Sequence, residues 1–141
     1  MRGSLNFPPH DPPVSGTQRL VGYSVDLTDP GGTARVSLDI RAQHMNRNGS
    51  LHGGLHATIM DAAAGFAASR HLAGGAAQIV PVVTLSLTTN FLAPAVSGRV
   101  VAVGHVTGGG RKIVYANAEV LAEDGTVLST CTGVFRRAPG E

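Results

Sequence analysis

Residues 53–71 read GGLHATIMDAAAGFAASRH, and the spacing of apolar side chains in this stretch decides the fold class. Apolar residues recur there at steps of three and four, the period of an amphipathic helix. The two glycines at 74–75 predict where the helix ends. We therefore expect one long helix from about Gly53 to His71. The stripe expected to face a sheet consists of Leu55, Ile59, Phe66 and Ala67.

The sequence on both sides of this helix alternates between apolar and polar residues, as β-strands do. Before the helix, residues 21–27 and 34–41 flank a Pro-Gly-Gly turn and predict a hairpin. After the helix, four more segments alternate: 83–91, 99–106, 113–122 and 127–136. Short turns join these segments, so the sheet should be largely antiparallel. The predicted fold is α+β, with one helix lying in the curve of an antiparallel sheet.

Composition limits the classes of protein to which the chain can belong. With 141 residues, of which 43% are hydrophobic, it fits one compact domain. Only 14% of the residues are charged, so we expect a homo-oligomer to cover part of the surface. A net charge of +2 and an aromatic share of 4% argue against a nucleic-acid binder.

The same composition gives expectations about location and boundaries. A single cysteine, Cys131, excludes a disulfide within the chain and fits a reducing compartment. No apolar run is long enough to cross a bilayer and no charged-then-apolar signal opens the chain, so we expect a cytoplasmic protein without a membrane segment. Residues 1–19 are rich in proline and predict a flexible arm. One domain should span 20–137, followed by a tail at 138–141.

Asp61 is the ionisable residue of greatest interest on the predicted helix. It lies off the apolar stripe, and two interpretations compete. A helical aspartate is most often a solvated surface group. Alternatively, small neighbours let another backbone approach closely, and the carboxylate acts as a base at a subunit contact. The small residues expected on its face are Ala57, Ala64, Gly65 and Ala68.

The start of the helix offers a second chemical feature. Gly53 and Gly54 leave uncovered the first backbone amides, which lack intrahelical partners. Such amides, at the positive end of the helix dipole, suit a carbonyl oxygen that develops negative charge, although a Gly-Gly pair is often only a turn. His52 and His56 are four residues apart, but the motif has no Glu base or third ligand, so we predict no metal site.

Arg111 and Lys112 follow three glycines that we interpret as a hairpin turn. The glycines lack the spacing of a phosphate-binding P-loop. The two basic side chains, which include the only lysine of the chain, are candidates for contact with phosphates at the surface.

Two stretches carry a resemblance to a known family. Residues 46–54, NRNGSLHGG, followed by Ala57 and Asp61, resemble the signature of hotdog-fold thioesterases of the phenylacetate-degradation (PaaI-like) type. Downstream, residues 84–94, TLSLTTNFLAP, and the later glycine turns are similar to the same family's pattern. The resemblance spans roughly residues 20–136.

The resemblance implies a hotdog fold, a helix wrapped by a curved antiparallel sheet. It also implies homodimers, commonly paired into homotetramers, that hydrolyse acyl-CoA thioesters without a metal or an organic cofactor. In this family the site is shared, so Asp61 and Thr84 of one subunit would face Asn46 and Gly53 of its partner.

The resemblance also assigns roles to residues. Asp61 would be the nucleophile or the base that activates water, and Thr84 would orient the water or the carboxylate. The Gly53 amide would polarise the thioester carbonyl with help from Asn46, and His52 would organise that loop. The residues expected to contact substrate are Gly54, Ala64, Val80, Arg111 and Lys112.

Two rival functions stay open at this point. Hotdog domains also hydrate or dehydrate acyl thioesters, and some could bind acyl-CoA without turnover. The position of His52 before the helix and Asp61 within it favours hydrolysis over the first. An intact Asp61 argues against the second. The sequence does not choose between a nucleophilic and a general-base route, nor does it define the acyl group.

Overall fold

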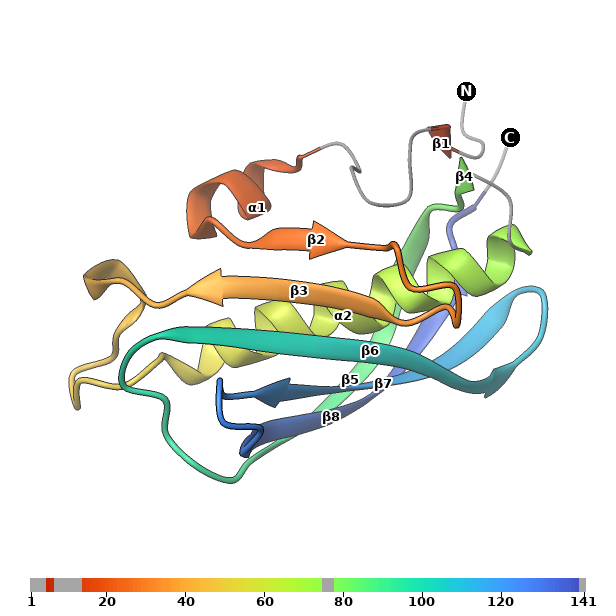
Figure 1. The fold of residues 1–141 in the computed structure, drawn as a ribbon. Coiled ribbons are helices and arrows are strands. Elements are labelled where there is room, and N and C mark those ends of the chain that lie inside the picture. The colour runs from red at the N-terminus through yellow and green to blue at the C-terminus, as the bar shows by residue number, and fades with distance from the viewer. Residues whose placement is uncertain (1–4, 7–13, 75–77, 140–141) are drawn as a thin grey trace.

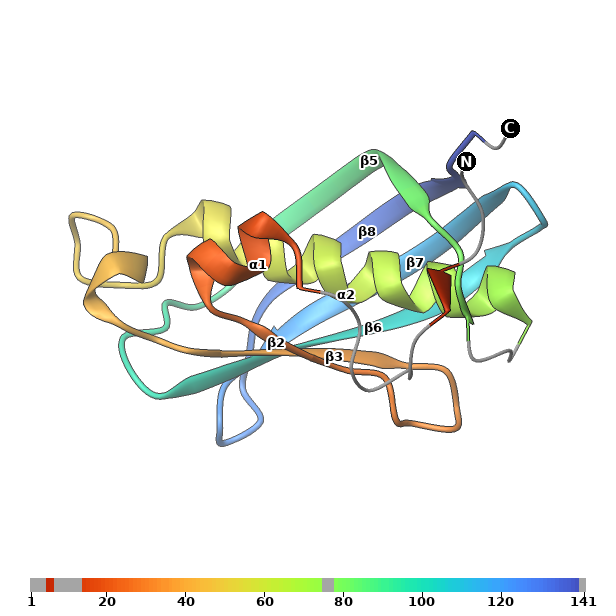
Figure 2. The same ribbon diagram turned by 90° about the horizontal axis from the view of Figure 1, so that it is seen from above.

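Helix α2, Gly53–Ala73, lies along one face of a six-stranded antiparallel sheet (Figure 1). The computed structural model describes residues 5–6, 14–74 and 78–139. The strand order is β2-β3-β6-β7-β8-β5, and the sheet curves around the helix (Figure 2). This arrangement confirms the expected α+β hotdog architecture. The strands are β2 (Ser24–Asp26), β3 (Ala34–Asp39), β5 (Val82–Phe91), β6 (Arg99–Gly109), β7 (Ile113–Leu121) and β8 (Val127–Arg137).

Both ends of α2 are set by local chemistry. His52 is the N-cap, and its Nδ1 accepts a hydrogen bond from the Gly54 N–H at 2.9 Å. Gly74 ends the helix in the left-handed conformation, with φ of 64°, and its N–H donates to the His71 carbonyl. The predicted helix is therefore confirmed. Within the described part of the chain, no helix has the length and hydrophobicity that a membrane span requires.

The small residues of α2 let the helix approach its own sheet. A Cβ atom on Gly104 of β6 would lie 2.3 Å from the carbonyl carbon and oxygen of Ala63, so the two backbones are almost in contact. Ala64 and Ala68 are fully buried within the chain itself. The prediction that they lie on an accessible strip beside Asp61, facing another chain, is therefore wrong. Leu55 and Phe66, which were expected in the buried stripe, are only half-buried.

The N-terminal part of the fold also differs from the prediction. Residues expected to belong to the extended arm and the first strand form helix α1, Gly16–Val21. Ser15 caps this helix by accepting a hydrogen bond from the Gln18 N–H at 3.0 Å, and Gly22 ends it with φ of 91°. The first hairpin strand is consequently short and begins at Ser24. The alternation from Val21 onward wrongly indicated that the strand starts there, because residues 16–21 follow the capping signal of a short helix.

A few short elements complete the fold. Strand β1 (Leu5–Asn6) pairs with β4 (Gln78–Ile79) in a small second sheet, and neither strand was predicted. A 3-10 turn, η1 (Ala42–His44), precedes the loop that leads into α2. The rest of the predicted arm, residues 1–4 and 7–13, lies outside the described residues, as do residues 140–141 of the predicted tail.

The contact between Gly104 and Ala63 yields a prediction about stability. Gly104→Ala should lower the free energy of unfolding by about 1–3 kcal/mol or more, because neither backbone can yield without moving α2 off the sheet. Gly110→Ala is the matched control, since a Cβ there meets nothing within 4 Å. Urea unfolding of both variants measures the difference. Equal stability of the two would show that the helix and the sheet are not in close contact at this point.

Candidate functional site

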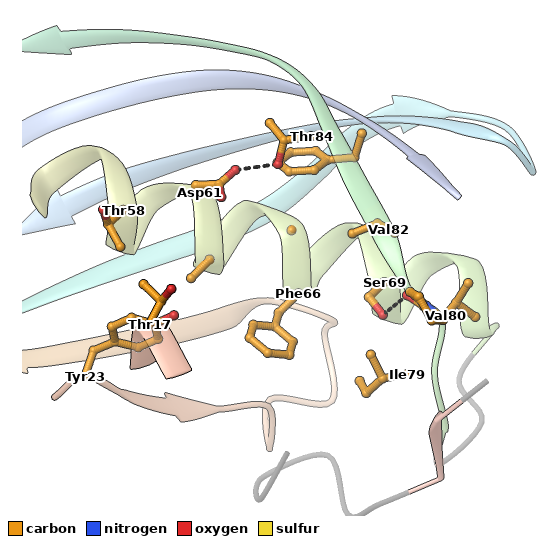
Figure 3. Close-up of a pocket in the computed structure, with 14 residues that line it drawn as sticks. Thr17, Tyr23, Thr58, Asp61, Phe66, Ser69, Ile79, Val80, Val82 and Thr84 are labelled. Carbon is orange, nitrogen blue, oxygen red and sulfur yellow. Dashed lines mark hydrogen bonds between the residues drawn. The ribbon is translucent and has the colours of Figure 1, made fainter. Parts of the chain in front are cut away.

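Asp61 and Thr84 meet between α2 and β5. The Thr84 hydroxyl donates a hydrogen bond to Oδ1 of Asp61 at 2.7 Å (Figure 3). Asp61 is half-buried and Thr84 is exposed, so the pair sits at the surface end of the helix–sheet contact. The structure thus brings together two residues for which the sequence resemblance predicted linked roles.

A β-bulge in β5 turns Thr84 toward the helix. The pairing of β5 with β8 runs Thr84 with Phe135 but then shifts, so that Leu87 lies opposite Gly133. Phe135 and Gly133 are buried on the side of α2, and directly paired residues share a face, so Thr84 and Leu87 both face the helix. The regular alternation expected over residues 83–91 would put Thr84 on one face with Ser86, Thr88 and Asn90, and the bulge breaks that alternation. The extra residue leaves Thr84 alone among these four on the helix side.

Asp61 forms part of the wall of a cavity of ≈340 Å³. Most of the cavity's lining is aliphatic or aromatic, and its polar groups are mainly hydroxyls. Of the residues expected to contact substrate, Val80 is in the wall, whereas Ala64 is in the core with no exposed surface and does not line the cavity. The residues labelled in Figure 3 are Thr17, Tyr23, Thr58, Asp61, Phe66, Ser69, Ile79, Val80, Val82 and Thr84.

Two residues of this wall, Thr17 and Tyr23, were missed by the sequence analysis. Burial raises the pKa of Tyr23, a hydrogen bond with Ser15 opposes that rise, and the negative charge of Asp61 adds to it. The phenol therefore stays protonated at neutral pH and can donate a hydrogen bond. Thr17 was assigned to the arm and Tyr23 to a strand. The Ser15 cap was the available signal that α1 would bring Thr17 to the cavity.

The loop before α2 is held by Asn46. Its Oδ1 accepts hydrogen bonds from the N–H groups of Asn48, at 2.8 Å, and Ser50, at 3.1 Å. Its Nδ2 donates to the Ser50 hydroxyl at 3.1 Å. Gly49 takes a positive φ of 75° in the same turn. Asn46 thus shapes the loop, while His52, predicted to organise it, caps the helix that follows.

A second cavity, of ≈350 Å³, lies at the start of α2. Asn46 and Gly53 line it, and neither lines the cavity of Asp61. Gly53 and Asp61 are eight residues apart on one helix, roughly 12 Å along its axis at about 1.5 Å per residue. One chain therefore holds the predicted residues as two separate groups. Asp61 and Thr84 form one group, and Asn46 and Gly53 form the other.

His56 also lines the second cavity and is almost fully buried, with 3% of its surface exposed. Its Nδ1 lies 2.7 Å from the hydroxyl oxygen of Ser129 on β8. Burial lowers the pKa of His56. His52 is instead exposed and bonded to the backbone, so the two histidines do not form a pair. Within residues 5–6, 14–74 and 78–139, no three His, Cys, Asp or Glu side chains gather as a metal site requires.

Arg111 and Lys112 are exposed in the turn between β6 and β7. Arg137 ties this turn to the end of β8, because its Nε donates to the Arg111 carbonyl at 3.2 Å and its N–H donates to the Lys112 carbonyl at 2.8 Å. Arg137 pairs in turn with Val82, which lines the Asp61 cavity. The two basic residues are therefore close to one edge of that cavity without lining it.

Comparisons with solved structures place this geometry among known folds. The PaaI protein of the E. coli phenylacetic acid degradation operon is similar, with 23% identity, a TM-score of 0.77, and coverage of 89% of this chain and 86% of that one. A conserved protein of Pseudomonas aeruginosa has 29% identity and a TM-score of 0.77, over 88% of this chain and 94% of its own. A mutant of the phenylacetic acid degradation protein PaaI from Thermus thermophilus has 27% identity and a TM-score of 0.74, over 87% of this chain and 99% of its own.

Comparison of the sequence with family models identifies the family of the chain. A search of curated proteins finds no match. The family model of the thioesterase superfamily matches residues 48–129. These residues include 48–52 of the loop before α2, all of α2 and all of β5. This match shows that the chain belongs to the thioesterase superfamily, and its hotdog fold is the one that the PaaI proteins share.

Proposed function

We propose that this protein is an acyl-CoA thioesterase that hydrolyses its substrate to free CoA and a carboxylate, with Asp61 as the reactive group. The observation that carries this proposal is the Asp61 carboxylate, oriented by the Thr84 hydroxyl at 2.7 Å in the wall of a largely apolar cavity. Membership of the thioesterase superfamily supports it.

The chemistry of the proposal follows from the surroundings of Asp61. The bond from Thr84 engages Oδ1 and fixes the plane of the carboxylate, which leaves Oδ2 for the reaction. In one route that oxygen takes a proton from water as the water attacks the thioester carbonyl, the C–S bond breaks and the CoA thiolate leaves with a proton. In the other it attacks the carbonyl itself and expels the CoA thiolate to form an anhydride, which water then opens to the carboxylate and free Asp61. The apolar cavity takes the acyl group in either route.

The oxyanion donors are proposed to come from a second copy of the chain. The Gly53 amide and Asn46 lie in a different cavity from Asp61, so one copy alone does not assemble the site. Strand β5 is at the edge of the sheet and exposes apolar side chains, with Leu85 53% and Phe91 55% exposed. An unpaired apolar edge is a surface that a partner covers. We therefore propose a homodimer joined along β5, with dimers pairing further into a homotetramer.

The position of Arg111 and Lys112 fits a role in binding the phosphates of CoA. Both side chains are exposed and lie near the edge of the Asp61 cavity, where they can attract an anionic arm whose thioester end enters the site. Gly54 is proposed to contribute through its lack of a side chain beside the Gly53 amide.

Replacement of Asp61 tests the reactive group. Asp61→Asn keeps the size of the side chain and its hydrogen bond with Thr84 but removes the charge, so kcat should fall roughly a hundredfold to ten-thousandfold. The measurement is release of free thiol from a panel of aryl- and alkanoyl-CoA esters. Near-normal turnover by the variant would remove Asp61 from the mechanism. Enoyl-CoA formation or consumption without thiol release would instead identify a hydratase or dehydratase.

Replacement of Gly53 tests the oxyanion donor. Gly53 is the first residue of α2 and follows His52 at φ of −58° and ψ of 134°, so the backbone accepts proline here, whose ring carbon replaces the N–H. Gly53→Pro should lower kcat roughly a hundredfold or more. Gly53→Ala is the control, because it keeps the N–H and its Cβ meets Phe91 only at an ordinary 3.5 Å. Equal activities of the two variants would exclude the amide as a donor.

A mixture of the two inactive variants tests whether the site is shared. In a hybrid dimer of Asp61→Asn and Gly53→Pro chains, one of the two sites combines an intact Asp61 with an intact Gly53. Random pairing should therefore restore about a quarter of wild-type activity. Co-expression with two purification tags and a thiol-release assay measures this recovery. A mixture as inactive as its components would place the whole site within one chain.

A further inference from the structure

His56 is a buried polar side chain in the cavity that contains the proposed oxyanion donors. It lies one turn beyond Gly53 on α2 and lines the cavity together with Gly53 and Asn46. Phe91 of β5 packs edge to face against the His56 imidazole and covers it from the side of that strand. The two ring centroids are 5.6 Å apart. Ser129, the partner of His56, has no exposed surface.

One nitrogen of the ring remains available to a ligand. Nδ1 is engaged by the Ser129 hydroxyl, and no hydrogen bond is assigned to Nε2 among the described residues. In the same part of the chain, no buried side-chain nitrogen or oxygen lacks a partner. Nε2 is therefore not sealed in the core but reaches the cavity that His56 lines.

Ser129 determines which nitrogen carries the proton. Its hydroxyl has one hydrogen, with two acceptors in range, the Nδ1 of His56 at 2.7 Å and the sulfur of Met60 at 3.7 Å. A thioether is a weak acceptor, whereas the lone pair of an imidazole nitrogen is a strong one. The stronger acceptor favours donation by the hydroxyl to Nδ1, which places the hydrogen of the neutral ring on Nε2, facing the cavity.

We infer that the Nε2–H of His56 is a further hydrogen-bond donor to the thioester carbonyl oxygen, beside the Gly53 amide and Asn46. This inference rests on the proposed hydrolase function and adds a catalytic residue to it. No proton is transferred, because the ring donates a hydrogen bond as the oxygen gains negative charge and keeps its hydrogen throughout. Ser129 acts as a positioning residue that fixes the tautomer.

Burial supports a neutral donor in this place. Loss of water lowers the pKa of His56, so the ring stays uncharged at neutral pH. A neutral imidazole N–H is a hydrogen-bond donor that does not protonate the carbonyl oxygen or the thiolate. It therefore stabilises the developing charge in the same way as the backbone amide next to it.

Substitutions that separate the donor from the fold test the inference. His56→Leu removes the donor and should lower kcat roughly a hundredfold, with a much smaller change in KM. His56→Gln places an amide N–H near the position of Nε2 and should restore most of kcat. His71→Leu makes the same change at an exposed histidine in the last turn of α2 and should keep wild-type turnover.

Ser129 provides a second set of variants. Ser129→Ala frees the tautomer and should cause a smaller loss of kcat than His56→Leu. The double variant His56→Leu with Ser129→Ala removes both buried polar partners, so no buried polar group is left without a hydrogen bond. Its kcat should be as low as that of His56→Leu. Wild-type kcat in a folded His56→Leu or double variant overturns the inference.

A measurement on the unmodified protein covers the case in which the variants do not fold. In ¹⁵N-histidine-labelled protein, NMR should show His56 protonated at Nε2, and its Nε2 signal should shift when an inert ketone analogue of acyl-CoA binds. A proton on Nδ1, an analogue that binds without moving the signal, or no binding each overturns the inference. A shifted signal in a protein that releases no thiol would retain the His56 contact and reject the proposed hydrolysis.

Discussion

Because Gly104 has no side chain, the backbone of α2 rests almost directly on the backbone of β6. This contact holds the helix at a fixed height above the sheet, and the height determines what each helical residue can reach. Alanines on α2 and on the facing strands β6 and β7 extend the close approach along the helix. A helix spaced by larger side chains would stand farther from β5, and the Asp61 carboxylate would not meet the Thr84 hydroxyl. The close packing of the helix on the sheet therefore also determines the geometry of the candidate site.

The bulge in β5 is the second local feature on which the candidate site depends. A regular strand would keep Thr84 on the same face as Ser86, which the observed register puts on the opposite side from α2. One extra residue lets the start of β5 present a hydroxyl to Asp61, while its later part presents Leu87 and Phe91 to the helix. The strand thereby combines a polar contact with the Asp61 carboxylate and an apolar contact with the start of α2.

Much of this was predictable from sequence, and the failures have specific causes. The long helix and four later strands were predictable because their periods are regular over many residues. The pairing of Asp61 with Thr84 came from the family resemblance, since spacing alone cannot place a strand residue against a helix. Helix α1 was missed because it is only six residues long. Ala64 and Ala68 were placed wrongly because an alanine is compatible both with a core and with a subunit contact. The His56–Ser129 pair joins residues 73 positions apart and has no local signal.

Helix α1 and the residue that precedes β2 give the Asp61 cavity a wall that lies outside the match to the family model. Thr17 and Tyr23 lie outside residues 48–129, the part of the chain that the family model matches. Asp61, the proposed reactive group, lies inside that part together with Thr84 and helix α2. Insertions or replacements in the N-terminal segment can therefore reshape the proposed acyl cavity while the reacting groups stay unchanged.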